Sequence, residues 1–443
     1  MSNTYLTRTL GTPTLATKAT CSMWFKLAEP TGQNTLFASA GNAAAFYLHT
    51  DSTLRVYNVD GSALTTNRVF RDTSAWYHLV VAIDTTQVTA SNRVKVYING
   101  IQETSFSSAS YPNQNSASAF GNATAHFVGA NTSPANYFNG SMSHIHLIDG
   151  TAYDASAFGS VDSDTGEWSI NTSPSVTYGN NGFFILKDGN TITDSSPNSN
   201  NFSLGGGTLT KTEDCPSNVF ATFNPLGLGN DVTFSNGNCT ATYGTSGTRS
   251  IVTSTLGATS GKYYWEIEIQ GSSSADNAVL GISLNGWETG YAVAGETNQS
   301  WGFRGYNGLV YNNNSSVGGT WSTFTNGDII GVAVNLDDEQ GGLNKLYFSK
   351  NGTWLNSANP TNHSATTGVV GITKPENGTS GFLFPVISDA GSTATPQFKT
   401  NFGNGYFGTT AVASAGTNAS GIGIFEYDVP TGFTALSTKG LNL

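Results

Sequence analysis

Charged residues are scarce in this chain. Asp, Glu, Lys and Arg make up 11% of its 443 residues, against about 25% in ordinary soluble proteins. Their balance is acidic, with a formal net charge of −11. Nucleic-acid binding depends on basic patches that neutralise phosphate charge. We therefore expect no nucleic-acid partner, and the negative charge also disfavours an anionic membrane surface.

Cysteine is nearly absent. The three cysteines, Cys21, Cys215 and Cys239, cannot all pair, and none has the spacing of a zinc site. We interpret them as small apolar residues in the reduced thiol form, and we expect no cofactor.

Long apolar runs are also missing. No segment approaches the roughly 20 apolar residues of a membrane-spanning helix, which predicts no membrane insertion. No apolar signal segment precedes Thr4. We therefore expect synthesis in a cytoplasm without a signal peptide.

Sustained helical periodicity is lacking as well, whereas turn-forming residues are abundant, with 52 glycines. Strand patterns take its place. The segment 74–84 has the pattern of a strand, and in 93–98 the residues Val94, Val96 and Ile98 alternate with Arg93, Lys95 and Tyr97. Asn99-Gly100 then predicts a tight hairpin turn. The sequence predicts an all-β protein.

Strand patterns fill two stretches of the chain, separated by one that lacks alternation. Asp, Ser, Pro, Asn and Gly dominate the region between them, as in connectors. We predict two tandem β-sandwich (jelly-roll) domains with little helix. Their expected bounds are 1–190 for the first, 191–222 for a linker, and 223–443 for the second.

The first stretch resembles the laminin-G-like, concanavalin A-like sandwich. The matching segments are Met23-Trp-Phe-Lys26, Trp76-Tyr-His-Leu-Val80, Val96-Tyr-Ile-Asn-Gly100 and Phe138-Asn-Gly-Ser-Met-Ser-His-Ile145. The variant here, together with the segment 214–226, is similar to one found in virion proteins of tailed phages of marine bacteria.

The second stretch resembles a SPRY domain, which is also a two-sheet sandwich. The matching segments, in order, are Gly261-Lys-Tyr-Tyr-Trp-Glu-Ile267, Leu280-Gly-Ile282, Gly327-Asp-Ile-Ile-Gly-Val-Ala-Val334 and Leu346-Tyr-Phe-Ser-Lys-Asn-Gly352. The closing segment 426–443 is again similar to the end of such phage proteins.

These resemblances imply a non-enzymatic structural protein on the surface of a phage virion, made in the host cytoplasm. It would be a tail fibre, a receptor-binding protein or another appendage that attaches to a host glycan. The alternative is a capsid decoration or head-fibre protein with a purely structural role. The implied partners are other virion proteins, a host-surface glycan and further copies of the chain, since virion proteins assemble by symmetry.

A glycan-degrading enzyme is a further alternative. Glu266 and Glu268 are two residues apart on one predicted strand, so both carboxylates face the same side. Glycoside hydrolases place paired carboxylates across a cleft. The next position on this face is Gln270, and the segment fits a sandwich strand without any chemistry.

Two patterns raise the question of a metal site. His144 and His146 share a predicted strand face, with His126 and Asp149 as further candidates, but a hydrogen-bonded or solvated face of an outer strand is the favoured interpretation. The loop 335–345 gathers three carboxylates, which calcium favours, yet it lacks the EF-hand spacing. We predict no bound metal.

Aromatic residues are concentrated in 286–313, among Gly and Asn. Rings stack on the CH faces of sugars, while amides and hydroxyls give directed hydrogen bonds. This segment is therefore the predicted glycan surface, with five candidate residues: Trp287, Tyr291, Trp301, Tyr306 and Tyr311.

Overall fold

The computed structural model describes residues 3–40, 44–58, 61–187, 191–226, 231–244, 249–271, 277–284, 293–337, 344–362, 364–372, 381–391 and 395–443. The chain divides into two compact units. The first comprises Met1–Lys211 and Cys215–Ser217, and the second comprises Thr212–Asp214 and Asn218–Leu443.

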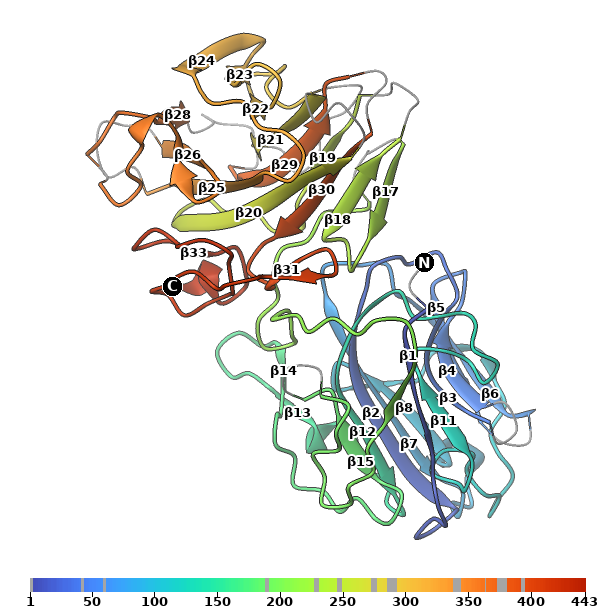
Figure 1. Ribbon diagram of the computed structural model, residues 1–443. Coiled ribbons are helices and arrows are strands. Elements are labelled where there is room, and N and C mark those ends of the chain that lie inside the picture. Colours follow the sequence, from blue (N-terminus) through green and yellow to red (C-terminus); the bar gives the residue numbers. More distant parts are fainter. Residues whose placement is uncertain are drawn as a thin grey trace. The chain divides into compact units, whose positions relative to one another are not determined.

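The first unit is a sandwich of two antiparallel sheets (Figure 1). Within the described residues the larger sheet has eight strands, in the spatial order β10 (Phe106–Ala109), β6 (Ala63–Val69), β5 (Thr53–Tyr57), β4 (Ala44–Leu48), β3 (Asn34–Ser39), β11 (Ala125–Val128), β1 (Tyr5–Thr9) and β16 (Ser203–Gly206). The smaller sheet has six, in the order β15 (Phe183–Ile185), β12 (Gly140–Asp149), β2 (Lys18–Leu27), β7 (Trp76–Asp84), β8 (Val94–Ile98) and β9 (Ile101–Glu103).

The core of the first unit follows the predicted alternation. Val94, Val96 and Ile98 are buried between the sheets, while Tyr97 lies on the other face of the small sheet. Asn99 and Gly100 have positive φ angles of 47° and 79°, as a type I′ turn requires. The predicted strands and hairpin are confirmed.

An additional layer covers the outer face of the small sheet. It includes the hairpin of β13 (Gly159–Val161) and β14 (Trp168–Ile170) and the turn η4 (Ala155–Ala157). Phe158 and Tyr178 from this layer form a second apolar cluster with Val80 and Ile148 of the sheet. The small sheet is therefore buried on both faces.

The predicted linker, 191–222, differs from the structure over about its first two thirds, residues 191–211. β16 pairs with β1, and Phe202 is buried in the core of the first unit, so residues 191–211 belong to that unit. The polar turn residues of this segment surround one short edge strand, whose pattern is too brief to be recognised.

The second unit is also a two-sheet sandwich (Figure 1). Its larger sheet, within the described residues, contains β17 (Val232–Ser235), β18 (Thr240–Tyr243), β30 (Pro396–Asn401), β20 (Lys262–Gly271), β25 (Ile329–Asn335), β26 (Asn344–Lys350) and β27 (Thr353–Trp354), with β28 (Val370–Ile372) beside β26 and β33 (Thr434–Ala435) parallel to β20. The smaller sheet runs β19 (Ile251–Thr253), β29 (Phe384–Asp389), β21 (Ala278–Ser283), β22 (Ser300–Arg304), β23 (Leu309–Asn312) and β24 (Ser315–Thr320).

The segment that follows β30, residues 402–443, covers part of the outer face of the larger sheet, and we call it the C-terminal segment. It carries the short hairpin of β31 (Tyr406–Phe407) and β32 (Thr410–Ala411). Phe425 and Phe433 pack with Tyr264 and Tyr347 in a cluster separate from the core between the sheets. β20 is thus covered on both faces.

The prediction of an all-β fold with two sandwiches is confirmed. All helical structure in the described residues consists of short 3-10 turns: η3 (Ala90–Asn92), η4, η6 (Leu355–Ser357) and η7 (Gly440–Asn442). Over the same residues, no helix has the length and apolarity to span a bilayer.

Candidate functional site

The predicted glycan surface is only partly available for binding. Trp287 and Tyr291 lie outside the described residues. Trp301 is a correction to the sequence prediction: it is 3% exposed and packs in the core with Phe303. The cause is the alternation of β22, which directs both rings toward the opposite sheet.

Tyr306 and Tyr311 remain on the surface. Tyr306 lies in the turn between β22 and β23 and is 48% exposed. Tyr311 is partly buried, and the guanidinium carbon of Arg304 lies 4.0 Å from its ring centroid. Asn307 Nδ2 donates a 3.0 Å hydrogen bond to the Tyr311 hydroxyl. We call these four residues, Arg304, Tyr306, Asn307 and Tyr311, the tyrosine surface.

The Arg304 guanidinium, which is the cation of the tyrosine surface, lies near the carboxylate of Glu296. Glu296 Oε1 lies 4.0 Å from Arg304 Nη2 and accepts a 2.8 Å hydrogen bond from Arg249 Nη1. The Arg304 side chain is 14% exposed. The guanidinium is therefore positioned over one face of the Tyr311 ring by packing and charge.

Glu266 is buried and satisfied by protein donors. Its Oε1 accepts hydrogen bonds from the Tyr264 hydroxyl at 3.0 Å and the Tyr427 N–H at 2.9 Å. Its Oε2 accepts from Asn401 Nδ2 at 3.2 Å and the Glu426 N–H at 2.9 Å. Burial raises the pKa of Glu266 to about 7, although these donors lower it.

Glu268 shares the strand face with Glu266, as predicted, but has a different environment. It accepts a 2.7 Å hydrogen bond from Gln270 and pairs with Lys399 at 3.5 Å. Glu266 is completely covered by the C-terminal segment. The two carboxylates thus anchor neighbouring structure and do not line a common cleft.

The three candidate histidines, His126, His144 and His146, are buried and lie in different sheets. His144 and His146 are on β12, and both rings pack against Phe184 of β15. His146 Nδ1 is 3.0 Å from the Tyr178 hydroxyl. His126 is on β11 in the other sheet, next to Phe37. Burial lowers the pKa of His126 to about 4 and the pKa of His146 well below its usual value.

Asp149 has a structural role at the end of β12. Its carboxylate accepts hydrogen bonds from the N–H groups of Thr14 at 2.6 Å and Asn181 at 3.1 Å. Within the described residues, no group of three His, Cys, Asp or Glu side chains is arranged to hold a metal. In the carboxylate-rich loop 335–345, residues 338–343 lie outside the described part, and Asp337 pairs with Lys262.

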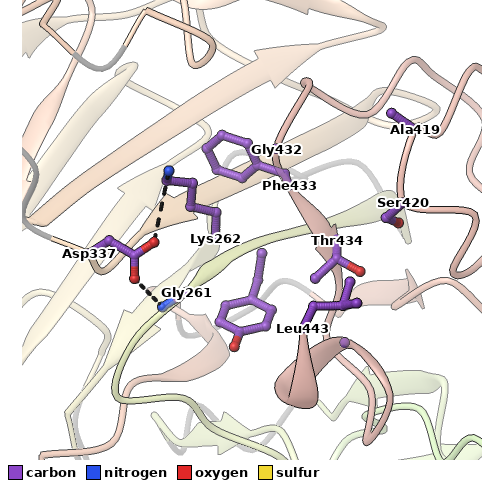
Figure 2. A pocket seen from close by; sticks show the side chains of 11 residues that line it. Gly261, Lys262, Asp337, Ala419, Ser420, Gly432, Phe433, Thr434 and Leu443 are labelled. Carbon is purple, nitrogen blue, oxygen red and sulfur yellow. Dashed lines mark hydrogen bonds and ion pairs between the residues drawn. The ribbon is translucent and has the colours of Figure 1, made fainter.

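A pocket of about 360 Å³ opens in the second unit, beside the start of β20 (Figure 2). One wall is formed by Gly261, Lys262 and Tyr263 with Asp337, and the opposite wall by the C-terminal segment, including Phe433 and Thr434. Sequence reasoning missed it because its walls lie more than 80 residues apart in the printed sequence. No local motif marks such a site.

Two family models match the chain. The model described as the concanavalin A-like lectin/glucanases superfamily matches residues 2–156. The model of the SPRY domain matches residues 262–403. The comparison with curated proteins finds no match.

Solved structures similar to the chain include the SPRY domain of human HERC1, with 21% identity, covering 40% of this chain and 96% of that one at a TM-score of 0.30. The SPRY domain structure of TRIM65 has 15% identity and covers 40% of this chain and 91% of that one at a TM-score of 0.28. A proposed carbohydrate binding protein from Bacteroides ovatus has 14% identity and covers 47% and 58% at a TM-score of 0.30.

The two matches fall in different units, in the order that the sequence predicts. The chain therefore carries a laminin-G-like, concanavalin A-like domain in its N-terminal part and a SPRY domain in its C-terminal part.

Proposed function

We propose that the chain is a non-enzymatic recognition protein on the surface of a phage virion, and that it attaches the particle to a host glycan. The virion assignment is supported by the resemblance of the segments 214–226 and 426–443 to phage proteins. The recognition role is supported by two sandwich domains of types that serve as binding scaffolds. Fold alone does not determine function, and the glycan-binding role is supported by the tyrosine surface.

The observation that carries the proposal is the exposed Tyr306 in the turn of a hairpin that also carries Tyr311, Asn307 and Arg304. Tyr306 is 48% exposed in the turn, and in the same hairpin Asn307 and Arg304 contact Tyr311. A sugar ring would stack on a tyrosine, while its hydroxyls would bond the neighbouring polar groups. Binding surfaces commonly lie on such turns, supported by a rigid sheet.

The hydrogen bonding of Glu266 favours a binding role over glycan hydrolysis. An acid catalyst must reach the glycosidic oxygen. Four donors occupy the Glu266 oxygens, and the side chain has no exposed surface. The purely structural alternative, a capsid decoration or head-fibre protein, predicts no glycan binding at all.

The test is binding of the purified chain to an array of bacterial lipopolysaccharides and capsular polysaccharides. We expect Tyr306→Ala to weaken binding about fivefold, the loss of roughly 1 kcal/mol of stacking. Phe382→Ala is the matched control, because Phe382 is a 45% exposed ring elsewhere in the same unit. Absence of binding, or equal binding by all three proteins, would refute attachment through this surface.

A parallel assay tests the alternative that the chain is a glycan-degrading enzyme. The bound polysaccharides are incubated with the chain and new reducing ends are measured. We expect none. Reducing ends that disappear in the Glu266→Gln variant would establish hydrolysis instead.

Assembly is part of the proposal. Weak individual sites become effective when many copies act together on one particle. We expect the chain to form homo-oligomers, and mass photometry at increasing concentration measures this directly.

A further inference from the structure

Two aromatic side chains of the layer over the small sheet bond to buried histidines of that sheet. We call residues 153–178 the covering layer. The Trp168 Nε1–H donates a 2.9 Å hydrogen bond to His78 Nδ1, and the Tyr178 hydroxyl lies 3.0 Å from His146 Nδ1. His78 is 1% exposed and His146 is 2% exposed. We propose that Trp168 and His78 form a proton-sensitive latch, which releases the covering layer from the sheet when His78 becomes protonated.

The position of Trp168 is determined by close packing against backbone. Its ring lies against Gly100 in the turn between β8 and β9 and against Gly159 of β13, and a Cβ added at either glycine would overlap ring atoms. The same turn is joined to His78, because Asn99 Oδ1 accepts a 2.8 Å hydrogen bond from the His78 N–H. The indole and imidazole planes are 18° apart. The indole N–H therefore meets His78 in one arrangement only.

Protonation of His78 would break this hydrogen bond. An indole N–H can only donate, so Nδ1 of His78 is the acceptor and the ring proton lies on Nε2, 2.9 Å from Ser22 Oγ. A proton taken from solvent would form an N–H bond at Nδ1, and two donors would then face each other. The Tyr178 hydroxyl can donate or accept, so it can stay bonded to protonated His146. His78 is thus the histidine whose protonation directly opposes closure of the layer.

The charge that acts on His78 is that of another histidine. Burial, together with the charge of His144 on β12, lowers the pKa of His78 to about 3. His146 is affected in the same direction by burial and by the charges of His144, His78 and Lys187. Both effects keep the imidazoles neutral while the covering layer is closed.

The other charged groups on the surrounding elements either pair elsewhere, share the face of the sheet as cations, or lie in the layer itself. Lys18 of β2 pairs with Asp84 of β7 at 3.1 Å. Strand alternation places Lys26 of β2 and Lys95 of β8 on the covered face. The charged residues of the layer are all carboxylates: Asp154, Asp162, Asp164 and Glu167. Asp154 and Asp162 each accept a 2.9 Å hydrogen bond from an N–H group of their own turn.

Opening of the layer would be favoured by acid. An exposed histidine has a pKa near 6.5, so an open layer takes up a proton that the closed layer does not accept. The equilibrium constant for opening is therefore lowest above pH 6.5 and rises as the pH falls toward 3. For one histidine the increase from pH 7 to pH 5 is about 25-fold. Opening would uncover Val80 and Ile148, which pack beneath Phe158 and Tyr178.

The experiment is amide hydrogen exchange of the full chain at pH 7 and pH 5, followed by mass spectrometry and corrected for intrinsic exchange rates. We expect peptides from 153–178 to lose protection about 25-fold at pH 5. Peptides from β3, in the other sheet, should keep theirs. Equal protection of 153–178 at both pH values would overturn the latch. Parallel loss in β3 would also overturn it, because the whole unit would then be opening.

Two variants identify the group that takes up the proton. His78→Asn places an acceptor oxygen near the position of Nδ1 and cannot be protonated, so the pH response of 153–178 should disappear. His126→Asn is the matched control, since it removes an equally buried histidine from β11 in the other sheet, and it should leave the response unchanged. A response that persists in His78→Asn would assign the proton to another group and refute the latch.

The indole proton of Trp168 gives a second measurement, which needs no variant of His78. In the chain labelled with ¹⁵N-tryptophan, its resonance is the one that is missing from Trp168→Phe. We expect this proton to exchange about 25-fold faster at pH 5 than at pH 7 after correction for the intrinsic rate. An indole proton that is equally protected at both pH values would overturn the latch, even if His78→Asn does not fold.

Discussion

The indole N–H of Trp168 donates a 2.9 Å hydrogen bond to Nδ1 of His78, which lies 90 residues earlier in the chain. Because an indole can only donate, His78 Nδ1 is the acceptor and the ring proton is on Nε2. That nitrogen lies 2.9 Å from Ser22 Oγ, and the imidazole stacks on Trp24 at 4.6 Å. His78 therefore joins the hairpin of the covering layer to the middle of the small sheet.

The first prediction is that Trp168→Phe destabilises the first unit. It removes the donor to a buried acceptor, and such a loss costs about 1–3 kcal/mol of unfolding free energy. Urea denaturation followed by circular dichroism measures the change. Trp354→Phe, a partly buried tryptophan of the second unit, is the control for the change of ring. Equal stability of Trp168→Phe and the parent would contradict a structural role for this bond.

The second prediction concerns acid sensitivity. Burial lowers the pKa of His78 to about 3 and of His126 to about 4, below the unfolded value near 6.5. Below that value the unfolded chain gains protons that the folded chain does not accept. The free energy of unfolding is therefore at its full value above pH 6.5. It falls toward pH 4, by about 1.4 kcal/mol per pH unit for each such histidine.

His146→Phe tests this dependence with a ring of similar shape in the same aromatic surroundings. The pKa of His146 is also lowered by burial. The free energy of unfolding, measured from pH 7.5 to 4.5, should decline less steeply in the variant. The difference in slope should correspond to about one proton fewer taken up on unfolding. The same slope in both proteins would mean that His146 does not titrate on unfolding.

Alternation along the sequence predicted which residues share a strand face, and it succeeded for Val94, Val96 and Ile98 and for the Asn99-Gly100 turn. It did not predict what covers each face. His146 and Glu266 point away from the cores between sheets, yet both are buried by segments far along the chain.

The same reason accounts for the errors at the candidate site. The Gly-rich and Asn-rich composition around Trp301 predicts an exposed ring, but strand alternation directs the ring into the core. The pocket beside Lys262 depends on register between β20 and β33, which are more than 160 residues apart in the printed sequence. Composition and local pattern contain no information on such pairing.

The third prediction is that Glu266→Gln loosens the C-terminal segment. Glutamine has one acceptor oxygen, so its NH₂ group would face one of the backbone donors at Glu426 and Tyr427. We expect those two amides to exchange hydrogen at least tenfold faster. Glu268→Gln is the control, since the ion pair of Glu268 with Lys399 contributes about 0–1 kcal/mol. Unchanged exchange in Glu266→Gln would refute the anchoring role.

The fourth prediction concerns how the free energy of unfolding of the second unit depends on pH through the same carboxyl group. Burial raises the pKa of Glu266 to about 7, above the ordinary glutamate value of 4.5. Between these values the folded state holds a proton that the unfolded state releases. The contribution of Glu266 to the stability of the second unit is therefore complete below pH 4.5 and declines up to pH 7, opposite in sign to the histidines. The pH dependence of amide exchange in each unit, compared with Glu266→Gln, measures it.

The last prediction concerns the cation on the tyrosine surface. Arg304→Met would retain much of the apolar stem over Tyr311 but remove the guanidinium 4.0 Å from the ring and its pairing with Glu296. A partly exposed cation–π contact contributes about 0.5–1 kcal/mol, so we expect a stability loss of that size in the second unit. Glycan binding should fall further than stability, because Tyr311 would lose the contact that fixes its ring. Arg68→Met is the matched control: it removes a 2.7 Å pair with Glu103 in the first unit. If Arg304→Met binds polysaccharide as tightly as Arg68→Met does, the orientation of Tyr311 is not part of the recognition surface.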